Sequence, residues 1–407
     1  MQLHIWSMKS SLSFKRIFLI LSGLAILSPL ALDTFLPGVD DAAQAFDTNI
    51  GNIMVSFGIL SVGVAAGQII HGPLSDRFGR KPVIVLGLIF FSGTSFLTPF
   101  MPNIELFYTL RFIQGLAVAA TMIVMRSIVR DLFNVNDGAK LFANLFMILA
   151  IMPIIGPIIG GHLTTWFGWQ SIFYMMTGIS IVVLFNIVML FEESLQKKDP
   201  NALNIDNLIL NFKEIITEQN FLTFLLVGIG AYAGLYAVIT GVAPVMTGLL
   251  QQDSDVFGYQ FAAIMTGHFI SAAIAGRLVN VFGIKKLLFF GTFISVAGGI
   301  LLLIASLVNI ITIYSILLPS TLFLIGFALT IPGMTAGALS NFQHMAGRAT
   351  SLLGFIQHGV GSLVSITLGV IMDGGSPMPM AICLASTSLF AFISFIICIP
   401  RTVLEVE

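Results

Sequence analysis

The 407-residue chain is poor in charge, since Asp, Glu, Lys and Arg make up only 9% of it. An ordinary soluble protein has about a quarter of its residues charged, so water is not the main solvent here. The net charge of -1 gives no support for a nucleic-acid partner. Only two cysteines occur, Cys383 and Cys398, both in the last apolar run, and we expect no disulfide. We therefore expect a membrane protein.

Hydrophobic residues make up 57% of the chain and form twelve long apolar runs. Each run has about 20 residues, which is long enough to cross a bilayer as a helix. The ten-residue alternation typical of transmembrane strands is missing. We predict an all-α membrane protein with twelve spans, at residues 17–37, 51–71, 82–100, 105–125, 141–162, 169–191, 221–244, 257–276, 287–307, 310–332, 351–372 and 380–399.

Basic residues are absent from every second connection between these runs. Of the 18 Lys and Arg, 17 lie outside the apolar runs, and all 17 fall in alternate connections. By the positive-inside rule this set is cytoplasmic, which predicts an inner-membrane protein with both termini in the cytoplasm. No small-residue cleavage site follows the first run, so we expect it to be a retained helix.

One long connection, Glu192–Asn220, divides the spans six and six. We predict an N-terminal six-helix bundle at 1–191, a linker at 192–220 and a C-terminal six-helix bundle at 221–407. In the linker, apolar side chains recur at helical spacing opposite a polar side, which predicts an amphipathic helix on the cytoplasmic membrane surface. The apolar positions are Ile205, Leu208, Ile209, Phe212, Ile215 and Ile216.

The two halves also repeat a short segment. Residues 72–81, GPLSDRFGRK, align with residues 276–285, GRLVNVFGIK, each between the second and third span of its half. Duplicated, pseudo-symmetric bundles are a recurrent transporter design, with a substrate site near the membrane midplane where the halves meet. Asn280 replaces Asp76 and cannot titrate, so a charge-based gate is expected to depend more on the N-terminal half than on the C-terminal half.

The first of these segments resembles the signature loop of the major facilitator superfamily. It matches at Gly72, Leu74, Asp76, Arg77, Gly79, Arg80 and Lys81. Residues 110–115 and 156–161 are similar to motifs of the twelve-helix drug:proton antiporters, and residues 33–37 and 126–133 most resemble the Bcr/CflA branch. The resemblance implies the major facilitator fold and a proton-coupled antiporter that exports small amphipathic compounds, as in multidrug efflux and drug resistance. It implies no cofactor, and we expect a monomer in membrane lipid.

Two charged residues lie within the first six apolar runs away from their ends, Asp33 and Arg111. A charge at mid-bilayer costs about 2.5 to 3.5 kcal/mol, so we expect each to face a water-filled cavity and to take part in proton coupling. An acid shielded by apolar helices and modulated by substrate or by Arg111 can bind and release a proton near neutral pH. Alternatively, the two form a permanent structural pair, or Arg111 holds Gln114 or a backbone carbonyl.

Family resemblance implies an inner gate in which contacts at the cytoplasmic end hold the halves together. Its residues would be Gly72, Asp76, Arg77, Gly79, Arg80 and Asp131. Glycines permit a tight turn between helices, Asp76 can accept from a helix N-terminus, and Arg80 is expected to pair with Asp131. The alternative is that the basic residues only fix topology.

A hinge and a cavity complete the predicted site. The resemblance implies a hinge in the fifth span at Gly156, Pro157, Gly160 and Gly161, with simple helix packing as the alternative. Adaptable apolar and polar side chains suit a drug cavity, and the expected lining is Met54, Phe57, Gln114, Met147, Tyr232, Tyr236 and Gln357. His268 and His358 also fall deep in the second half, where they can bind substrate or protons.

Other functions stay open on the same sequence. An exporter of an endogenous metabolite such as a siderophore, or a nutrient importer, would keep the fold and change the cargo. A passive channel would need neither a titratable Asp33 nor a gate. A membrane enzyme is disfavoured, because no His, Asp and Glu cluster with metal spacing and no nucleophile elbow is found.

Overall fold

The computed structural model describes the backbone of residues 3–342 and 345–402, and the side chains of 14–134, 136–342 and 345–398. The helices are α1 (Leu3–Asp33), α2 (Val39–Ala45), α3 (Ile50–Phe78), α4 (Arg80–Leu97), α5 (Ile104–Leu132), α6 (Val135–Phe167), α7 (Gln170–Leu190), α8 (Ile205–Thr217), α9 (Gln219–Ala243), α10 (Ser254–Leu307), α11 (Ile313–Leu339), α12 (Ala346–Ile371) and α13 (Met378–Thr402). Three short helices join them, η1 (Leu36–Gly38), η2 (Thr98–Phe100) and η3 (Pro244–Leu249).

Within this part of the chain, eleven segments are long and apolar enough to cross a membrane. One of them, α10, has 54 residues and would be about 81 Å long if straight, more than twice the thickness of a bilayer core. Gly283 breaks it, with φ 76° and ψ 163° inside an otherwise helical run. α10 therefore contains two spans, and the predicted total of twelve is confirmed.

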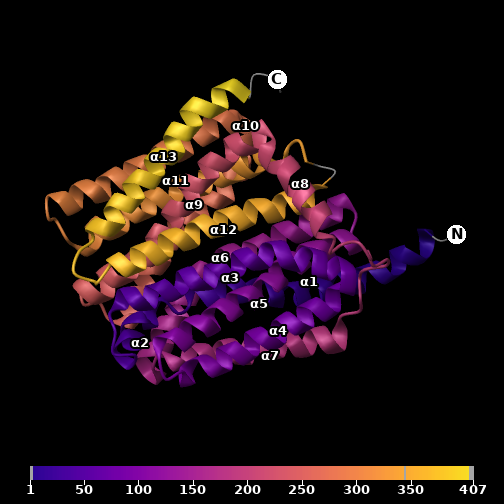
Figure 1. Cartoon of the computed structure of the whole chain (residues 1–407), viewed down its shortest axis with the longest axis horizontal. Helices are drawn as coiled ribbons and strands as arrows, with labels where there is room; N and C mark the ends of the chain where they lie inside the picture. The colour runs from indigo at the N-terminus through magenta and orange to yellow at the C-terminus, as the bar shows by residue number, and fades with distance from the viewer. Residues whose placement is uncertain (1–2, 343–344, 403–407) are drawn as a thin grey trace.

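The spans form two six-helix bundles, as predicted. Figure 1 shows α1 to α7 gathered on one side and α9 to α13 on the other. Helices α3 and α12 lie side by side where the two halves meet, and α6 packs on α10 in the same way. The amphipathic α8 lies in the connection between the halves, at one end of the molecule.

Several helix ends differ from the predicted spans. The first span is not one helix to Pro37, because α1 ends at Asp33 and a turn leads into η1. α5 continues seven residues past the predicted end at Met125, to Leu132. α11 runs through Pro332, which a membrane helix tolerates when neighbouring groups satisfy the freed carbonyl. Apolar runs mark the lipid-facing length of a helix and not its whole length.

Glycines let the two halves approach closely at one end. A Cβ atom on Gly51 of α3 would lie 1.8 Å from the carbonyl oxygen of Met372, after α12, and one on Gly258 of α10 would lie 2.4 Å from the carbonyl oxygen of Pro157 of α6. An added Cβ would lie 2.5 Å from the carbonyl oxygen of Ser254 at Gly161 and 2.9 Å from that of Gly51 at Gly369. We call these four positions, Gly51, Gly161, Gly258 and Gly369, the glycine seam. Backbone meets backbone there, so the seam closes this end.

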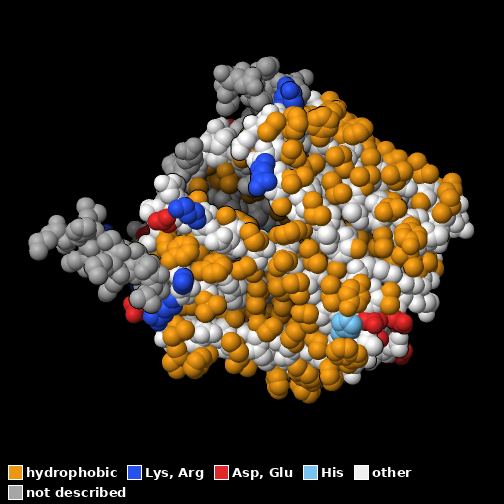
Figure 2. Space-filling model, turned by 180° about the vertical axis from the view of Figure 1, so that it is seen from behind, with side chains coloured by type: hydrophobic (Ala, Val, Ile, Leu, Met, Phe, Trp, Pro, Cys, Tyr) orange, Lys and Arg blue, Asp and Glu red, His pale blue; other side chains and the backbone are white. Residues whose placement is uncertain are grey.

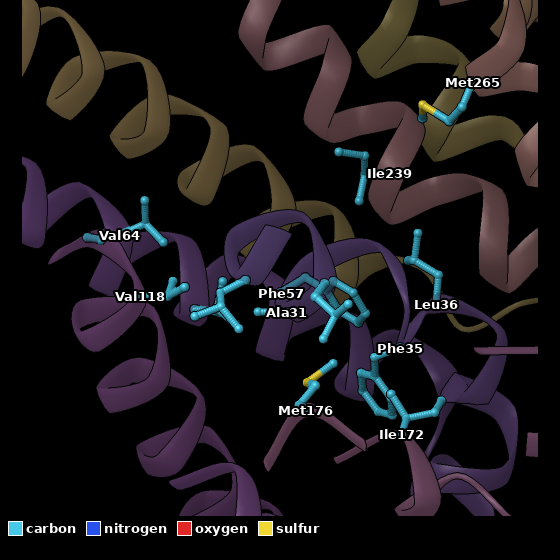
Figure 3. Packing of buried hydrophobic residues seen from close by; sticks show 14 of the residues in the cluster. Ala31, Phe35, Leu36, Phe57, Val64, Val118, Ile172, Met176, Ile239 and Met265 are labelled. Carbon is cyan, nitrogen blue, oxygen red and sulfur yellow. The ribbon is translucent and has the colours of Figure 1, made fainter. Parts of the chain in front are cut away.

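Aromatic packing surrounds the break in the first span. Phe35, just after α1, stacks on Phe57 of α3 with ring centres 5.6 Å apart and an interplanar angle of 8°. Figure 3 shows both rings together with Ile172 and Met176 of α7. All four side chains are wholly buried. The core of the first half therefore holds the chain rigidly beside Asp33.

Candidate functional site: a cavity between the halves

A cavity of about 640 Å³ lies between the two halves at the end opposite the glycine seam. Its walls come from the ends of α3 and α5, the start of α12, and α8. Lysine and arginine side chains gather toward this end, and the face in Figure 2 is hollowed close to them. We call it the basic end. The rest of that face is mainly hydrophobic, as expected of a surface in contact with lipid.

Helix α8 forms part of the cavity wall. Leu208 and Phe212 line the cavity, and Ile215 is wholly buried against the second half. Ile205 and Ile209 are 69% and 58% exposed. The predicted amphipathic helix is therefore present, but its apolar side divides between the protein and a free surface that can meet lipid.

Arg80 organises the basic end of the first half. Its Nε donates to Oδ2 of Asp131 at 2.9 Å, and its Nη1 donates to Oδ1 of Asp76 at 2.5 Å and to the Ser75 hydroxyl at 2.7 Å. The expected pair between Arg80 and Asp131 is formed. These bonds join α3, α4 and α5 within one half, so their role as a gate between halves stays a prediction.

The linker is bound to the same network. Glu193 accepts hydrogen bonds from the backbone N–H groups of Arg80 and Lys81, at 2.9 and 3.1 Å, and so caps the N-terminus of α4. We expected Asp76 to accept from a helix N-terminus, but Glu193 does so, and Asp76 binds the Arg80 side chain. The guanidinium of Arg77 donates to the carbonyl of Pro200.

The two glycines of the loop differ. Gly79 makes the turn between α3 and α4, with φ 113°, a conformation that side chains other than glycine rarely adopt. Gly283 has a positive φ at the equivalent place in α10, which supports the repeat. Gly72 lies inside α3 with no atom within 4 Å of an added Cβ, so the expected turn role is wrong for Gly72.

Asp33 is the last residue of α1 and is 6% exposed. Its Cβ lies near Gly156 of α6, and Tyr236 of the second half is within electrostatic range of its carboxyl group. No ion pair or hydrogen bond to its carboxyl group is found among the described side chains. Carbonyl groups at a helix C-terminus also disfavour a negative charge. The described surroundings therefore give the Asp33 carboxyl group no permanent cation as a partner.

Arg111 does not pair with Asp33, so the structural-pair alternative is wrong. It is wholly buried, donates from Nη1 to Oε1 of Gln114 at 2.7 Å and from Nη2 to the carbonyl of Ala31 at 3.1 Å. Its Cζ lies 5.3 to 5.8 Å from the ring centres of Phe57, Phe35 and Phe173. The alternative that Arg111 holds Gln114 and a backbone carbonyl is the one the structure shows.

Small residues of α6 pack tightly on the break in the first span. An added Cβ would lie 2.9 Å from the Thr34 hydroxyl at Gly156 and 1.9 Å from the Thr34 carbonyl oxygen at Gly160. Gly161 and Pro157 instead contact α10 of the other half. α6 runs unbroken from Val135 to Phe167. These residues therefore provide close approach, and their bending as a hinge stays a prediction.

None of the seven predicted lining residues borders the cavity. Met54 and Phe57 are wholly buried in the first half, and Gln114 binds Arg111 and the Ser95 hydroxyl. Met147 is 61% exposed on α6. Apolar side chains face lipid, core or cavity alike, so residue type alone could not separate these places. Tyr232 and Tyr236 lie on α9 and Gln357 lies on α12, and Tyr236 and Gln357 are buried.

Arg126 is the functional candidate that the sequence missed. It was counted with the cytoplasmic connection, but it lies inside α5 and lines the cavity. Its charge acts on Tyr232 of α9 and His358 of α12. Tyr236 in turn meets Nδ1 of His358 at 2.9 Å. The sequence offered one signal. Phe133 lies seven residues, about two helical turns, after Arg126, so an α-helix that continues to Phe133 keeps Arg126 in the same helix as the apolar run.

Two six-helix halves that enclose a cavity open at one end define a multi-pass membrane transporter. A family model described as Major Facilitator Superfamily matches residues 21–366. The chain belongs to the Major Facilitator Superfamily of transporters, and it is not an enzyme.

Relatives and solved structures agree with this family. The bicyclomycin resistance protein homolog of Haemophilus influenzae is 26% identical over 364 residues, which are 89% of this chain and 91% of that protein. The multidrug resistance protein D of Escherichia coli is 24% identical over 352 residues, which are 86% of this chain and 88% of that protein. The structure of the nucleoside transporter NupG covers 93% of this chain and 99% of its own, with a TM-score of 0.73 and 12% identity, a likeness of fold alone.

Proposed function

We propose that the protein is a proton-coupled antiporter that exports small amphipathic compounds from a bacterial cytoplasm by alternating access. The named resistance proteins among its relatives support export of such compounds. The basic end is cytoplasmic in this proposal, because Lys and Arg gather there. The cavity then opens to the cytoplasm while the glycine seam closes the far end.

The observation that carries the proposal is the unpaired carboxyl group of Asp33 at the break of the first span. Arg111 is occupied by Gln114 and Ala31, so no permanent cation holds Asp33 ionised. Its neighbour Gly156 belongs to α6, the helix that packs on α10 of the other half. Protonation of Asp33 therefore changes the charge beside a helix at the interface of the two halves, which is where a switch between two arrangements must act.

The gate follows from the same geometry. In our proposal the Arg80 network keeps the ends of α3, α4 and α5 together as one unit when the basic end closes. Arg130 at the end of α5 already lies 3.3 Å from the Cβ position of Gly347 at the start of α12. Closure would bring these two helix ends together, and opening at the seam would accompany it.

The test is transport by Asp33→Asn in proteoliposomes with an imposed proton gradient. A panel of fluorescent cationic, neutral and anionic amphipaths supplies the cargo, and an internal pH dye reports protons. We expect the wild type to accumulate at least one compound against its gradient with proton flux in the opposite direction. Asp33→Asn should lose both uphill accumulation and proton flux while it retains downhill exchange.

Asp47→Asn is the matched control, since Asp47 is exposed beyond α2 and asparagine tolerates its φ of 48°. It should behave as wild type. Uphill transport by Asp33→Asn at the wild-type rate would refute the coupling role. If the wild type transports the panel equally well with and without the proton gradient, antiport is refuted and a channel is favoured.

A further inference from the structure

Among the described residues, four arginines and three aspartates line the cavity, but their charges are not evenly neutralised. The arginines are Arg80, Arg126, Arg130 and Arg348, and the aspartates are Asp76, Asp131 and Asp199. Arg80 takes both Asp76 and Asp131. Asp199 accepts from the backbone N–H of Asn201 at 2.8 Å, in the linker. In the part of the wall that the structure describes, three arginines therefore face the cavity against one remaining carboxylate.

Arg126 is the innermost of the three. It lies six residues before the end of α5 at Leu132, about 9 Å along the helix axis, whereas Arg130 and Arg348 lie exposed at helix ends. No hydrogen bond or ion pair reaches its guanidinium from any side chain that the structure describes. A partly buried cation without a partner destabilises the folded protein, so we expect Arg126 to lower the free energy of unfolding.

The surroundings of Arg126 also fit an aromatic body. Phe212 of α8 lines the same cavity as Arg126, together with the apolar side chains of Ile69 and Ile123. Thr350 and Ser351 of α12 line it from the second half. A flat ligand can therefore contact the Phe212 ring and the start of α12 while it reaches a guanidinium of the first half. Such a ligand would touch both moving parts of the transporter.

We propose that the cavity selects amphipathic compounds that carry a carboxylate beside an aromatic body, and that Arg126 binds this carboxylate. This proposal rests on the proposed export function and names its class of cargo. A guanidinium offers two parallel N–H groups to a carboxylate, which gives both strength and orientation. A cationic compound of the same shape meets three arginines and is disfavoured.

Equilibrium binding to the purified full chain in lipid nanodiscs tests this selectivity without any gradient. Three probes share one fluorescent ring system, and they are dansylglycine, an anion, dansylglycinamide, which is neutral, and dansylcadaverine, a cation. We expect the wild type to bind dansylglycine at least tenfold more tightly than either other probe. Arg126→Gln should reduce this preference to threefold or less and leave the affinity for dansylglycinamide unchanged.

Arg126→Lys should keep part of the preference, because it retains the charge and loses the paired donors. Arg277→Gln is the matched control, since Arg277 is exposed between the two spans of α10 and away from the cavity, and the preference should stay intact. The wild-type preference is informative even where Arg126→Gln does not fold. Equal binding of the three probes, no binding of dansylglycine at millimolar concentration, or a full preference in Arg126→Gln would overturn the proposal.

The outcomes separate this proposal from the proposed function. A dansylglycine preference that depends on Arg126, together with an Asp33→Asn variant that still pumps, would leave the cargo class standing and remove the coupling role. Proton-coupled export of neutral or cationic compounds, with no preference in the binding assay, would do the reverse.

Discussion

Arg80 Nε lies 2.9 Å from Asp131 Oδ2 and joins the start of α4 to the end of α5. Because Arg80 is 5% exposed and also holds Asp76, Arg80→Gln leaves two carboxylates without their cation. We expect it to lower the free energy of unfolding by about 2 kcal/mol, less than for a fully buried pair because Asp76 is half-exposed. Denaturant titration in detergent measures it.

Lys140→Gln is the control for this change, because it breaks an exposed pair with Asp137 at 3.5 Å. Exposed pairs contribute little, so no measurable change is expected. Equal effects of the two substitutions would mean that Arg80 fixes topology only.

Arg111 is held by shape as well as by charge. Arg111→Lys keeps the charge but cannot hold Gln114 and the Ala31 carbonyl together within the ring of phenylalanines. We expect a loss of about 2 kcal/mol in the free energy of unfolding. Arg16→Lys makes the same exchange at an exposed position and should change stability little.

The same variant separates structure from coupling. Since Arg111 makes no contact with Asp33, Arg111→Lys that is folded should still show substrate-driven proton flux. A stable but uncoupled variant would instead show that Arg111 acts directly on the proton.

Gly160 provides close approach between α6 and the break in the first span. Gly160→Ala would place a Cβ 1.9 Å from the Thr34 carbonyl oxygen, so backbone must move, and we expect about 2 kcal/mol of destabilisation. Gly178→Ala on α7 meets nothing within 4 Å and should be neutral or slightly stabilising. Thermal melting of the two purified variants compares them. A tolerated Gly160→Ala would contradict the close approach.

Gly79 and Gly283 share a positive φ but not their surroundings. Alanine at either position is strained by about 1 to 3 kcal/mol, because a positive φ with ψ of 159° or 163° is nearly confined to glycine. At Gly79 the new Cβ would also lie 2.5 Å from a carboxylate oxygen of Glu193, whereas at Gly283 the space is open. We expect Gly79→Ala to lower the melting temperature clearly more than Gly283→Ala. The opposite order would refute the Glu193 cap.

The apolar runs predicted the helices because lipid imposes their length and composition. The repeat of Gly79 at Gly283 was predictable because a turn between two helices needs a positive φ in both halves. The pairing of Arg80 with Asp131 followed from opposite charges at adjacent helix ends.

Side-chain orientation was not predictable in the same way. Arg111 binds a backbone carbonyl and phenyl rings, and neither partner leaves a signal in the sequence. Arg126 was assigned to a connection because a charge ends an apolar run, although α5 continues to Leu132, about two turns beyond the predicted end at Met125. Met147 shows the converse, an apolar residue that faces outward because lipid accepts the same side chains as a cavity.

The glycine seam restricts which positions of this transporter can accept substitutions. At Gly51 and Gly258 even one methyl group would collide with backbone, whereas an added Cβ at Gly72 in the cavity wall meets no atom within 4 Å. When the protein is selected for transport of a new compound, substitutions should therefore arise among the residues that line the cavity. The seam positions should stay unchanged across the same lineages.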